Sequence, residues 1–338
     1  MARRFPAMFL VGPRRLELRE LPVPEPGPRE AVLRVEAATT CGTDLKVYLR
    51  GGHPRMLEVP GRFGHEMAGT VAATGRGCRL REGDRVVVAN SAPCGACSRC
   101  RAGRENLCEG LEYLNGAYGR YVLVPERFVR RAAHPAHGVP PEIAAMAEPL
   151  ACVLHGLERV APEPGAPVAV LGLGPIGLMF VATLVRRGHP VTAADPNPSR
   201  RERALRMGAA RAVEADREGR WAAAPSGRPA LVVEATGSPD GWVAALAAAD
   251  TGGEVLLFGG CPPGSRVPLD THRLHYGEQR VVGAYHHRPA TVRAALRLLR
   301  DAPETFRPVL DGERSLEELG EALEAMARRE ALKVVIRP

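Results

Sequence analysis

Lysine is almost absent from this 338-residue chain. Lys46 and Lys333 are the only two, so arginine supplies nearly all of the 46 basic side chains. A composition-biased genome produces such a preference, which makes a retained lysine a candidate for a specific role. The net charge is +8, but the arginines are spread along the whole sequence and form no dense basic stripe. This pattern argues against a nucleic-acid partner and favours a solvated surface.

Long apolar runs are also missing. No run approaches the roughly 20 residues that span a bilayer, which excludes a membrane-spanning protein. The stretch after Met1 is broken at Pro6 and Gly12 and lacks the core of a signal peptide, so we expect a cytoplasmic location. Hydrophobic residues make up 45% and charged residues 25%, as in globular proteins. A chain of this length predicts two domains.

The first 135 residues contain short β-branched runs bounded by glycine and proline turns, including Ala31–Val35, Gly69–Ala73 and Arg85–Val88. They predict an all-β, barrel-like lobe. Helical patterning starts near Pro141, and from Val168 strands and helices alternate as in a parallel, doubly wound sheet. The predicted strands are Val168–Leu171, Val191–Ala194, Leu231–Glu234, Val255–Phe258 and Val281–Gly283, and the predicted helices are Pro175–Arg187 and Ser199–Met207. A helix over Ala290–Leu299 and a strand over Leu332–Ile336 are too short to fold alone, so we expect them to return to the first lobe.

A glycine-rich loop, Gly172-Leu173-Gly174-Pro175-Ile176-Gly177, follows the first predicted strand of the sheet and opens a helix. In this context the GxGxxG pattern predicts a dinucleotide site: the glycines allow a tight turn and close approach to a pyrophosphate, which the helix N-terminus stabilises. The alternative is a glycine turn in an unrelated α/β protein.

Asp195 ends the second predicted strand of the sheet, where a carboxylate would accept hydrogen bonds from the adenosine ribose. It would repel a 2′-phosphate, so NAD is favoured. Arg200 and Arg201 follow closely and keep NADP open. Thr236 and Gly237, after the strand Leu231–Glu234, are further candidate cofactor contacts.

Four cysteines stand close together with the spacing C-x₂-C-x₂-C-x₇-C; they are Cys94, Cys97, Cys100 and Cys108. One loop that presents four thiolates can close a tetrahedral zinc site with no position for water, which makes such a site structural. An iron–sulfur cluster uses similar spacing, and unligated thiols are a further alternative. Crowded cysteines in a chain of this length suit a metal in a reducing compartment better than a disulfide framework.

A second set of metal-ligating residue types lies in the first lobe. Cys41 and the pair His65-Glu66 each stand beside glycine, and Glu148 is a further carboxylate. A thiolate, an imidazole and a carboxylate can hold Zn²⁺ and leave one position open, as catalytic zinc requires. Each of these residues taken alone is more often an ordinary packed or surface residue.

Taken together and in this order, these motifs resemble the medium-chain zinc alcohol dehydrogenase family over essentially the whole chain. They are Cys41-Gly42-Thr43-Asp44, Gly64-His65-Glu66, the Cys94–Cys108 loop, Glu148-Pro149-Leu150 and Gly172–Gly177. The resemblance implies two zinc ions and a nicotinamide cofactor. It also implies a GroES-like, β-rich catalytic domain (residues 1–150, completed by 286–338), a Rossmann domain (151–285), and a homodimer or homotetramer associating through the edge of the nucleotide-binding sheet.

The resemblance also implies residue roles. Cys41 and His65 would ligate the catalytic zinc, with Glu66 and Glu148 completing the sphere directly or through water. Thr43 would contact the reacting hydroxyl, and Asp44 would orient His65. In such a site zinc lowers the pKa of the substrate hydroxyl, and the alcohol carbon delivers hydride to the nicotinamide.

Within the family, glutamate at position 148 is similar to polyol and sugar dehydrogenases. Threonine dehydrogenases share Cys-Gly-Thr-Asp-Leu but usually carry histidine shortly before the cysteine cluster, where this chain has Asn90-Ser91-Ala92-Pro93. They rank second. A zinc-ribbon nucleic-acid-binding protein and a family member without catalysis are further alternatives, although the first leaves the glycine loop unexplained and the ligand set argues against the second.

Lys46 is a departure from the family pattern, because many relatives carry histidine at this position as the outer member of a proton relay. Lysine can lose a proton when its pKa is depressed. We therefore expect Lys46 to complete the relay or to bind a substrate oxygen or phosphate, with an ordinary solvated lysine as the alternative. Candidate pocket residues are Tyr48, Glu112, Tyr113 and the pair His286-His287, which could also lie at the surface.

Overall fold

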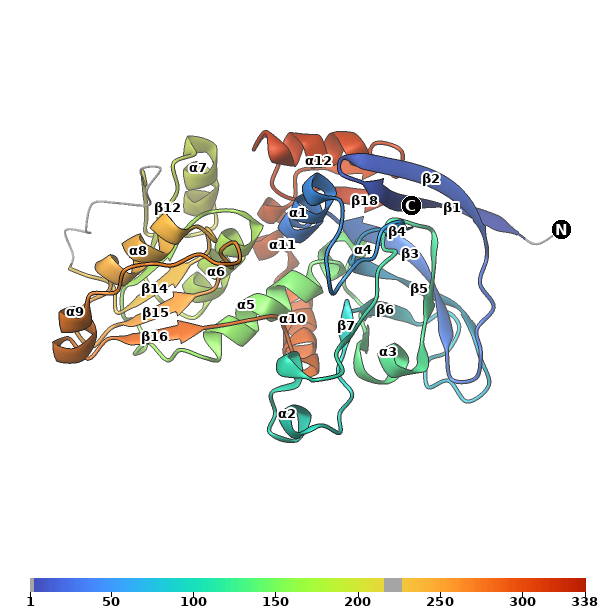
Figure 1. Ribbon diagram of the computed structural model, residues 1–338, viewed down its shortest axis with the longest axis horizontal. Coiled ribbons are helices and arrows are strands. Elements are labelled where there is room, and N and C mark those ends of the chain that lie inside the picture. The colour runs from blue at the N-terminus through green and yellow to red at the C-terminus, as the bar shows by residue number, and fades with distance from the viewer. Residues whose placement is uncertain (1–2, 216–226) are drawn as a thin grey trace. The chain divides into compact units, whose positions relative to one another are not determined.

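A computed structural model describes residues 3–215 and 227–338. The chain divides into two compact units. The first comprises Met1–Ala151 together with His287–Pro338, and the second comprises Cys152–His286. Figure 1 shows the elements of both units. Of the helices formed by the described residues, none combines the length and apolar character that crossing a membrane requires.

The first unit is built on β-sheets. Its larger sheet has the strand order β10-β6-β5-β3-β18-β17, with β9 also paired to β3, and a smaller sheet has the order β2-β1-β4. The strands are β1 (Arg4–Gly12), β2 (Arg15–Pro22), β3 (Ala31–Thr39), β4 (Gly61–Arg62), β5 (Glu66–Thr74), β6 (Arg85–Val88), β9 (Tyr121–Val124), β10 (Ala133–Pro135), β17 (Glu313–Ser315) and β18 (Val335–Arg337). The short pair β7 (Ser91–Ala92) and β8 (Glu112–Tyr113) stands apart. The predicted β-rich lobe is confirmed.

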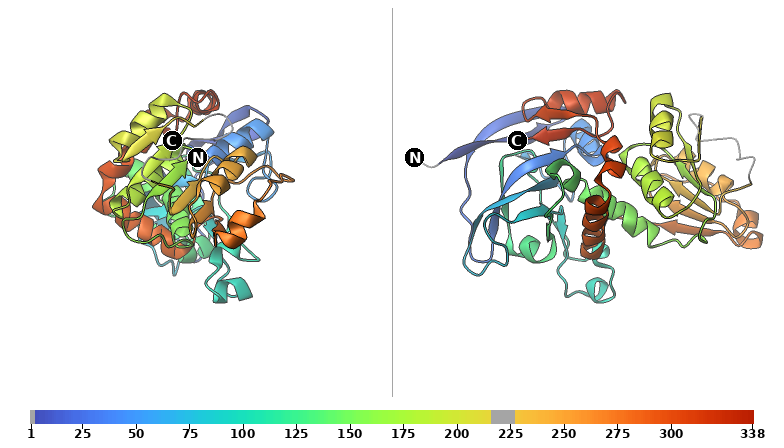
Figure 2. Two further views of the ribbon diagram at one scale, coloured as in Figure 1. Left: turned by 90° about the vertical axis from the view of Figure 1, so that its left-hand side faces the viewer. Right: turned by 180° about the vertical axis from the view of Figure 1, so that it is seen from behind.

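Strand β3 lies at the centre of the larger sheet and is buried along most of its length. It pairs antiparallel with β5, β9 and β18. Its first residues, Ala31-Val32-Leu33, form an apolar run and are all buried. The last strand of the chain, β18, is placed by its pairs Val335↔Thr39 and Ile336↔Ala38. The C-terminus therefore lies in the same sheet as β3 (Figures 1 and 2).

Helices close the first unit. They are α1 (Gly42–Arg50), α2 (Ser98–Arg101), η1 (Glu105–Leu107), α3 (Glu126–Arg131), α4 (Pro141–Ala144), the first turn of α5 (Ala147–Leu157), α10 (Pro289–Asp301), α11 (Pro303–Phe306), η2 (Arg307–Val309) and α12 (Leu319–Ala327). Helix α10 buries Val292, Ala295, Leu296 and Leu299, the three-to-four-residue spacing of one helix face. Helix α12 contacts α1, so the C-terminal segment packs on the helix that begins after Cys41.

The second unit contains a parallel sheet with the order β13-β12-β11-β14-β15-β16. The strands are β11 (Val168–Leu171), β12 (Val191–Ala194), β13 (Arg211–Val213), β14 (Leu231–Glu234), β15 (Glu254–Leu257) and β16 (Arg280–Gly283), and the helices are α6 (Pro175–Arg186), α7 (Pro198–Arg206), α8 (Pro239–Ala248) and α9 (Thr271–Tyr276). This order is that of a doubly wound dinucleotide-binding fold, in which ligands bind where the strand order reverses, at the carboxyl ends of β11 and β14. The predicted Rossmann sheet is confirmed.

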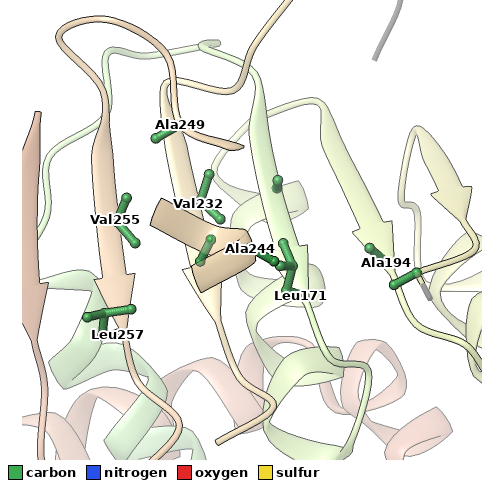
Figure 3. Close-up of a cluster of buried hydrophobic side chains, with 10 residues drawn as sticks. Leu171, Ala194, Val232, Ala244, Ala249, Val255 and Leu257 are labelled. Carbon is green, nitrogen blue, oxygen red and sulfur yellow. The ribbon is translucent and has the colours of Figure 1, made fainter. Parts of the chain in front are cut away.

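The core of this sheet is made of small and branched apolar side chains (Figure 3). Leu171, Val232 and Val255 are buried on three neighbouring strands, and Ala244 of α8 packs against them. In Figure 3 the helix that carries Ala244 crosses in front of the strands, while other helices lie behind them. Strands covered on both faces are apolar at every position, which is why β11 reads Val-Ala-Val-Leu.

Candidate active site

The N-terminus of α1 places a thiol. Cys41 is the residue that caps this helix, and its Sγ accepts the Thr43 backbone N–H at 3.4 Å. The Asp44 carboxylate in turn accepts the Cys41 backbone N–H at 3.2 Å. These reciprocal bonds satisfy two N–H groups that a helix start leaves without partners, and they fix the direction of the Cys41 side chain.

Asp44 also fixes His65, which immediately precedes β5. The His65 Nδ1 donates to Asp44 Oδ1 at 2.8 Å, and the Tyr118 hydroxyl donates to Asp44 Oδ2 at 2.7 Å. All three side chains are buried. With Nδ1 engaged, Nε2 is the His65 atom that remains to bind a ligand, which is the arrangement typical of metal-binding histidines.

Cys41, His65 and Glu66 come together with their ligand atoms within 4.8 Å of one another. Burial disfavours the charged form of His65, but the negative charges of Asp44 and Cys41 outweigh it and raise its pKa well above the usual value. The same negative surroundings favour a bound cation. A thiolate, an imidazole and a carboxylate at this separation fit the donor set of an open zinc site.

Glu66 is completely buried and forms an ion pair with Lys333, which stands just before β18. The Thr39 hydroxyl donates to the same carboxylate oxygen, Oε2, and the Lys333 ammonium also donates to the Thr40 carbonyl at 2.7 Å. The second oxygen, Oε1, is buried and has no hydrogen-bond partner among the described residues. An orphaned buried carboxylate oxygen is costly unless a ligand satisfies it, so this atom also fits a metal.

Glu148 lies at the edge of this cluster, in the first turn of α5, and not within the group of three. Its carboxylate is grouped instead with His287 and His286. Burial, together with the negative charge of Glu66, raises its pKa to about 7, although the neighbouring His65 lowers it. The dependence of this pKa on His65 and Glu66 shows that Glu148 is within electrostatic reach of the cluster.

The remaining candidate residues of the first unit differ in environment. Thr43 is half-buried, whereas Lys46 is exposed on α1. The Tyr48 hydroxyl donates to Glu324 at 3.0 Å, so it holds α12 against α1. Glu112 is exposed and pairs with Arg127 at 2.7 Å, whereas the half-buried Tyr113 lies beside it in β8.

The four clustered cysteines form a second group with ligand atoms within 4.8 Å. Cys94 Sγ lies 3.9 Å from Cys100 Sγ, and Cys97 Sγ lies 3.9 Å from Cys108 Sγ. A tetrahedral zinc with bonds of about 2.3 Å requires sulfur separations of about 3.8 Å. The loop therefore has the geometry of a closed tetrathiolate site, and backbone N–H groups that donate to Cys94 Sγ stabilise its thiolate.

In the second unit, the glycine loop has the close contacts that its sequence predicts. A Cβ added to Gly177 would lie 1.8 Å from the Gly172 carbonyl oxygen, and Gly172 itself has a φ of 87°. Gly174 caps α6, followed by Pro175 and Ile176, and no side chain caps the helix. The first N–H groups of α6 are thus available to a pyrophosphate.

Asp195 follows β12 and is buried beside this loop. Its Oδ2 accepts the Leu173 N–H at 2.7 Å and its Oδ1 accepts the Asn197 N–H at 2.8 Å. Arg200 lies 3.9 Å from Oδ2, while Arg201 donates to the Asp195 carbonyl at 2.9 Å. Asp195, which favours NAD, and Arg200, which could bind the 2′-phosphate of NADP, are therefore adjacent.

Thr236 and Gly237 follow β14 and face the same loop, since a Cβ on Gly172 would lie 2.8 Å from the Thr236 methyl group. Their N–H groups donate to the buried Glu234 carboxylate at 2.6 and 3.0 Å. Burial raises the Glu234 pKa, while these hydrogen bonds lower it. Glu234 thus shapes the loop that carries both candidate contacts.

Sequence reasoning assigned no role to Lys333, Tyr118, Glu234 or Asn90. For Lys333 the scarcity of lysine was a usable signal. Tyr118 and Glu234 lie in ordinary strand and loop contexts, so their buried partners become visible only in three dimensions. His287, left open between pocket and surface, is buried.

Comparisons with known proteins identify the family of the chain. The family model "Alcohol dehydrogenase GroES-like domain" matches residues 27–134, and "Zinc-binding dehydrogenase" matches residues 175–301. Sorbitol dehydrogenase of Bacillus subtilis (strain 168) is 30% identical over 339 residues, which cover 96% of this chain and 95% of that enzyme. D-altritol 5-dehydrogenase of Agrobacterium fabrum is 35% identical over 80% of this chain and 81% of that enzyme.

Solved structures show the same architecture. A protein from Sinorhizobium meliloti 1021, described as a zinc-binding dehydrogenase and bound to NADP, is 29% identical with a TM-score of 0.89, covering 99% of this chain and all of that one. Two domain models, a relative matched over nearly its full length and a superposable structure point the same way. The chain therefore belongs to the medium-chain zinc alcohol dehydrogenase family of NAD(P)-dependent oxidoreductases.

Proposed function

We propose that this enzyme oxidises a secondary alcohol of a polyol or sugar derivative, with one zinc ion at Cys41, His65 and Glu66 and a second in the Cys94–Cys108 loop. The alcohol carbon gives a hydride to NAD(P)⁺, and the hydroxyl proton leaves to solvent, so that a ketone and NAD(P)H are formed. The observation that carries the proposal is the grouping of a thiol, an imidazole and a buried carboxylate oxygen without a partner.

Different residues of the chain hold each of the three proposed metal ligands in place. When bound, zinc would supply Lewis-acid polarisation of the substrate oxygen. Asp44 holds the His65 Nδ1 proton and so keeps Nε2 as the ligand atom. Lys333 and Thr39 engage one oxygen of Glu66, which leaves Oε1 to face the metal. The α1 N-cap fixes the Cys41 thiolate.

Proton removal requires a group that connects the site to solvent. Thr43 is half-buried, one turn before the exposed Lys46 on the same helix. Side chains three residues apart lie on neighbouring parts of a helix surface. We therefore assign Thr43 Oγ1 to accept the substrate proton and to pass it outward, with Lys46 as the solvent-side end of this route.

The second unit binds the coenzyme in this proposal. The open N-terminus of α6 takes the pyrophosphate, while Asp195 takes the adenosine ribose. NAD is the preferred coenzyme because Asp195 is a buried carboxylate, and Arg200 beside it allows NADP as well.

The substrate class rests on Glu148 and on the sorbitol and altritol dehydrogenases among the relatives. L-Threonine is the second candidate, because Cys41-Gly42-Thr43-Asp44-Leu45 is shared with threonine dehydrogenases. We also propose a cytoplasmic enzyme, since four cysteines grouped as a metal site suit a reducing compartment. Finally, we propose a homodimer or homotetramer formed through β16, an edge strand whose residues are largely exposed.

A substrate screen tests the proposal. Zinc-loaded enzyme is offered polyols, sugars, inositols and L-threonine with NAD⁺ or NADP⁺, and the absorbance of the reduced nicotinamide is followed. Cys41→Ala is expected to lower kcat by about 100-fold or more. Polarisation by the metal lowers the activation free energy by several kcal/mol, and each 1.36 kcal/mol corresponds to a tenfold change in rate. Cys78→Ala is the matched control, since Cys78 is a free cysteine outside both groups. A Cys41→Ala enzyme as active as the wild type would contradict the proposal.

A further inference from the structure

Three buried polar side chains meet at the Glu148 side of the candidate active site. They are Asn90 between β6 and β7, Glu148 in the first turn of α5, and His287 just before α10, with 2%, 6% and 3% of their surfaces exposed. All three belong to the first unit. Asn90 and His287 have no part in the function proposed above.

The His287 ring connects the other two residues. Its Nε2 donates to the Asn90 side-chain carbonyl at 3.0 Å, and one oxygen of Glu148, Oε1, lies 3.6 Å from the same nitrogen. The bond to Asn90 sets the tautomer, because an amide oxygen can only accept, so Nε2 carries the proton. The Glu148 carboxylate thus lies at ion-pair distance from the nitrogen that carries this proton.

The position of His287 is set by the cysteine loop. The Asn90 backbone carbonyl accepts the Leu114 N–H at 2.9 Å, so Asn90 stands at the base of the loop that carries Cys94 to Cys108. Arg288, the neighbour of His287, donates from its guanidinium to the Gly103 carbonyl within that loop at 3.1 Å. Its backbone N–H donates to Thr291 at 3.0 Å, which fixes the start of α10. His287 is thus held by Asn90 at the base of the loop and, through its neighbour Arg288, by Gly103 within the loop.

Glu148 lies close enough to the metal-ligand cluster for its orientation to matter. It is a buried carboxylate within electrostatic reach of His65 and Glu66. A buried carboxylate needs hydrogen-bond donors to hold one direction, and histidine and amide groups around a metal site commonly orient its ligands.

We propose that His287, aimed by Asn90 and Arg288 from the cysteine loop, is the residue that positions the Glu148 carboxylate at the catalytic metal. This inference rests on the function proposed above. It gives the cysteine loop a defined influence on catalysis, through the side chains of Asn90 and Arg288 and the imidazole of His287. His287 acts through Glu148 and is a positioning residue.

The test uses the holoenzyme with cobalt in the catalytic position, because the absorption bands of Co²⁺ report the geometry of its ligands. His287→Leu is expected to shift these bands and to weaken the catalytic metal's affinity by about 10- to 100-fold, measured by competition with a chelator. His287→Gln is expected to restore most of the wild-type spectrum, because its amide can donate to Asn90 and Glu148. The Asn90→Ala/His287→Leu double variant is expected to be no worse than His287→Leu alone, since the two residues act as one unit.

His134→Leu is the matched control. His134 is also a buried histidine of the first unit, and it belongs to none of the three groups of metal-ligating side chains. It is expected to leave the cobalt spectrum and the metal affinity unchanged. Retention of the structural metal in every variant shows that the fold is intact.

The outcomes separate the two proposals. A wild-type enzyme that binds no metal at Cys41 and His65 would overturn the proposed function itself. A wild-type enzyme that binds this metal, together with a His287→Leu variant of identical spectrum and affinity, would overturn only the role of His287. The same holds if His287→Gln is as impaired as His287→Leu, because a generic loss of packing would then explain both.

Discussion

Replacing Lys333 by methionine removes the cation that neutralises Glu66 while keeping the length of the side chain. Lys333 and Glu66 are 1% and 0% exposed, and the Lys333 ammonium also donates to the Thr40 carbonyl at 2.7 Å. Removing one partner of a buried ion pair costs about 3–5 kcal/mol, because the other charge is left without compensation. In metal-free Lys333→Met protein we expect this loss in full.

The size of the effect can be stated as a melting temperature. For a unit of about 200 residues, each kcal/mol lowers Tm by roughly 2–4 °C, so the expected drop is roughly 6–20 °C. Zinc should reduce the drop, because a cation beside Glu66 supplies the charge that the variant lacks. Calorimetry of the metal-free and zinc-loaded forms measures both values.

Two further variants serve as controls for the stability loss of Lys333→Met. Lys333→Arg keeps the charge but adds volume in a completely buried place, so we expect a smaller loss of about 1–3 kcal/mol. Lys46→Met changes the other lysine, which is exposed, and should alter stability by no more than about 0.5 kcal/mol. If Lys333→Met melts within a degree or two of the wild type without metal, the ion pair does not hold Glu66 in place and the reasoning fails.

Other expectations concern separate parts of the chain. Burial, with smaller contributions from Arg293 and Arg79, lowers the His134 pKa to about 4. In the unfolded chain the histidine pKa is about 6.5, so as pH falls the unfolded state binds this proton before the folded state does. The free energy of unfolding of the wild type should therefore fall by about 3 kcal/mol between pH 6.5 and 4. His134→Leu should show a flatter loss of stability by denaturation over that range; an equal slope would contradict this. Asp195→Ala should raise KM for NAD⁺ by about 10- to 100-fold, as expected for lost charge-assisted hydrogen bonds, and KM for NADP⁺ much less; an equal rise for both would count against Asp195 as the ribose ligand. Cys100→Ser should reduce metal content from two ions per chain to one and lower Tm, whereas an unchanged content would rule out the closed site.

Much of the fold could be predicted from local sequence patterns. The strands Val168–Leu171, Val191–Ala194 and Leu231–Glu234 have the predicted bounds, because each is a short apolar run between turn residues. Strand β13 escaped prediction since Arg211-Ala212-Val213 is an edge of three residues with little apolar character. The last strand begins at Val335 instead of Leu332, and Lys333 in the segment before it forms the ion pair with Glu66.

The candidate site could be predicted only where residue types and their spacing form a recognisable motif. The cysteine loop and the glycine loop are contiguous motifs, so their members were identifiable from the sequence. The contacts of Lys333 with Glu66, and of His287 with Asn90, join residues 267 and 197 positions apart. No local pattern encodes such pairs, because strand pairing and helix packing bring them together.

The most direct test of the account is a crystal structure of the zinc-loaded enzyme with anomalous scattering recorded at the zinc edge. We expect one peak within about 2.3 Å of Cys41 Sγ and about 2.1 Å of His65 Nε2, and a second peak among the four cysteines of the loop. A map with density only in the cysteine loop, and with Cys41 and His65 turned away from each other, would contradict the central claim.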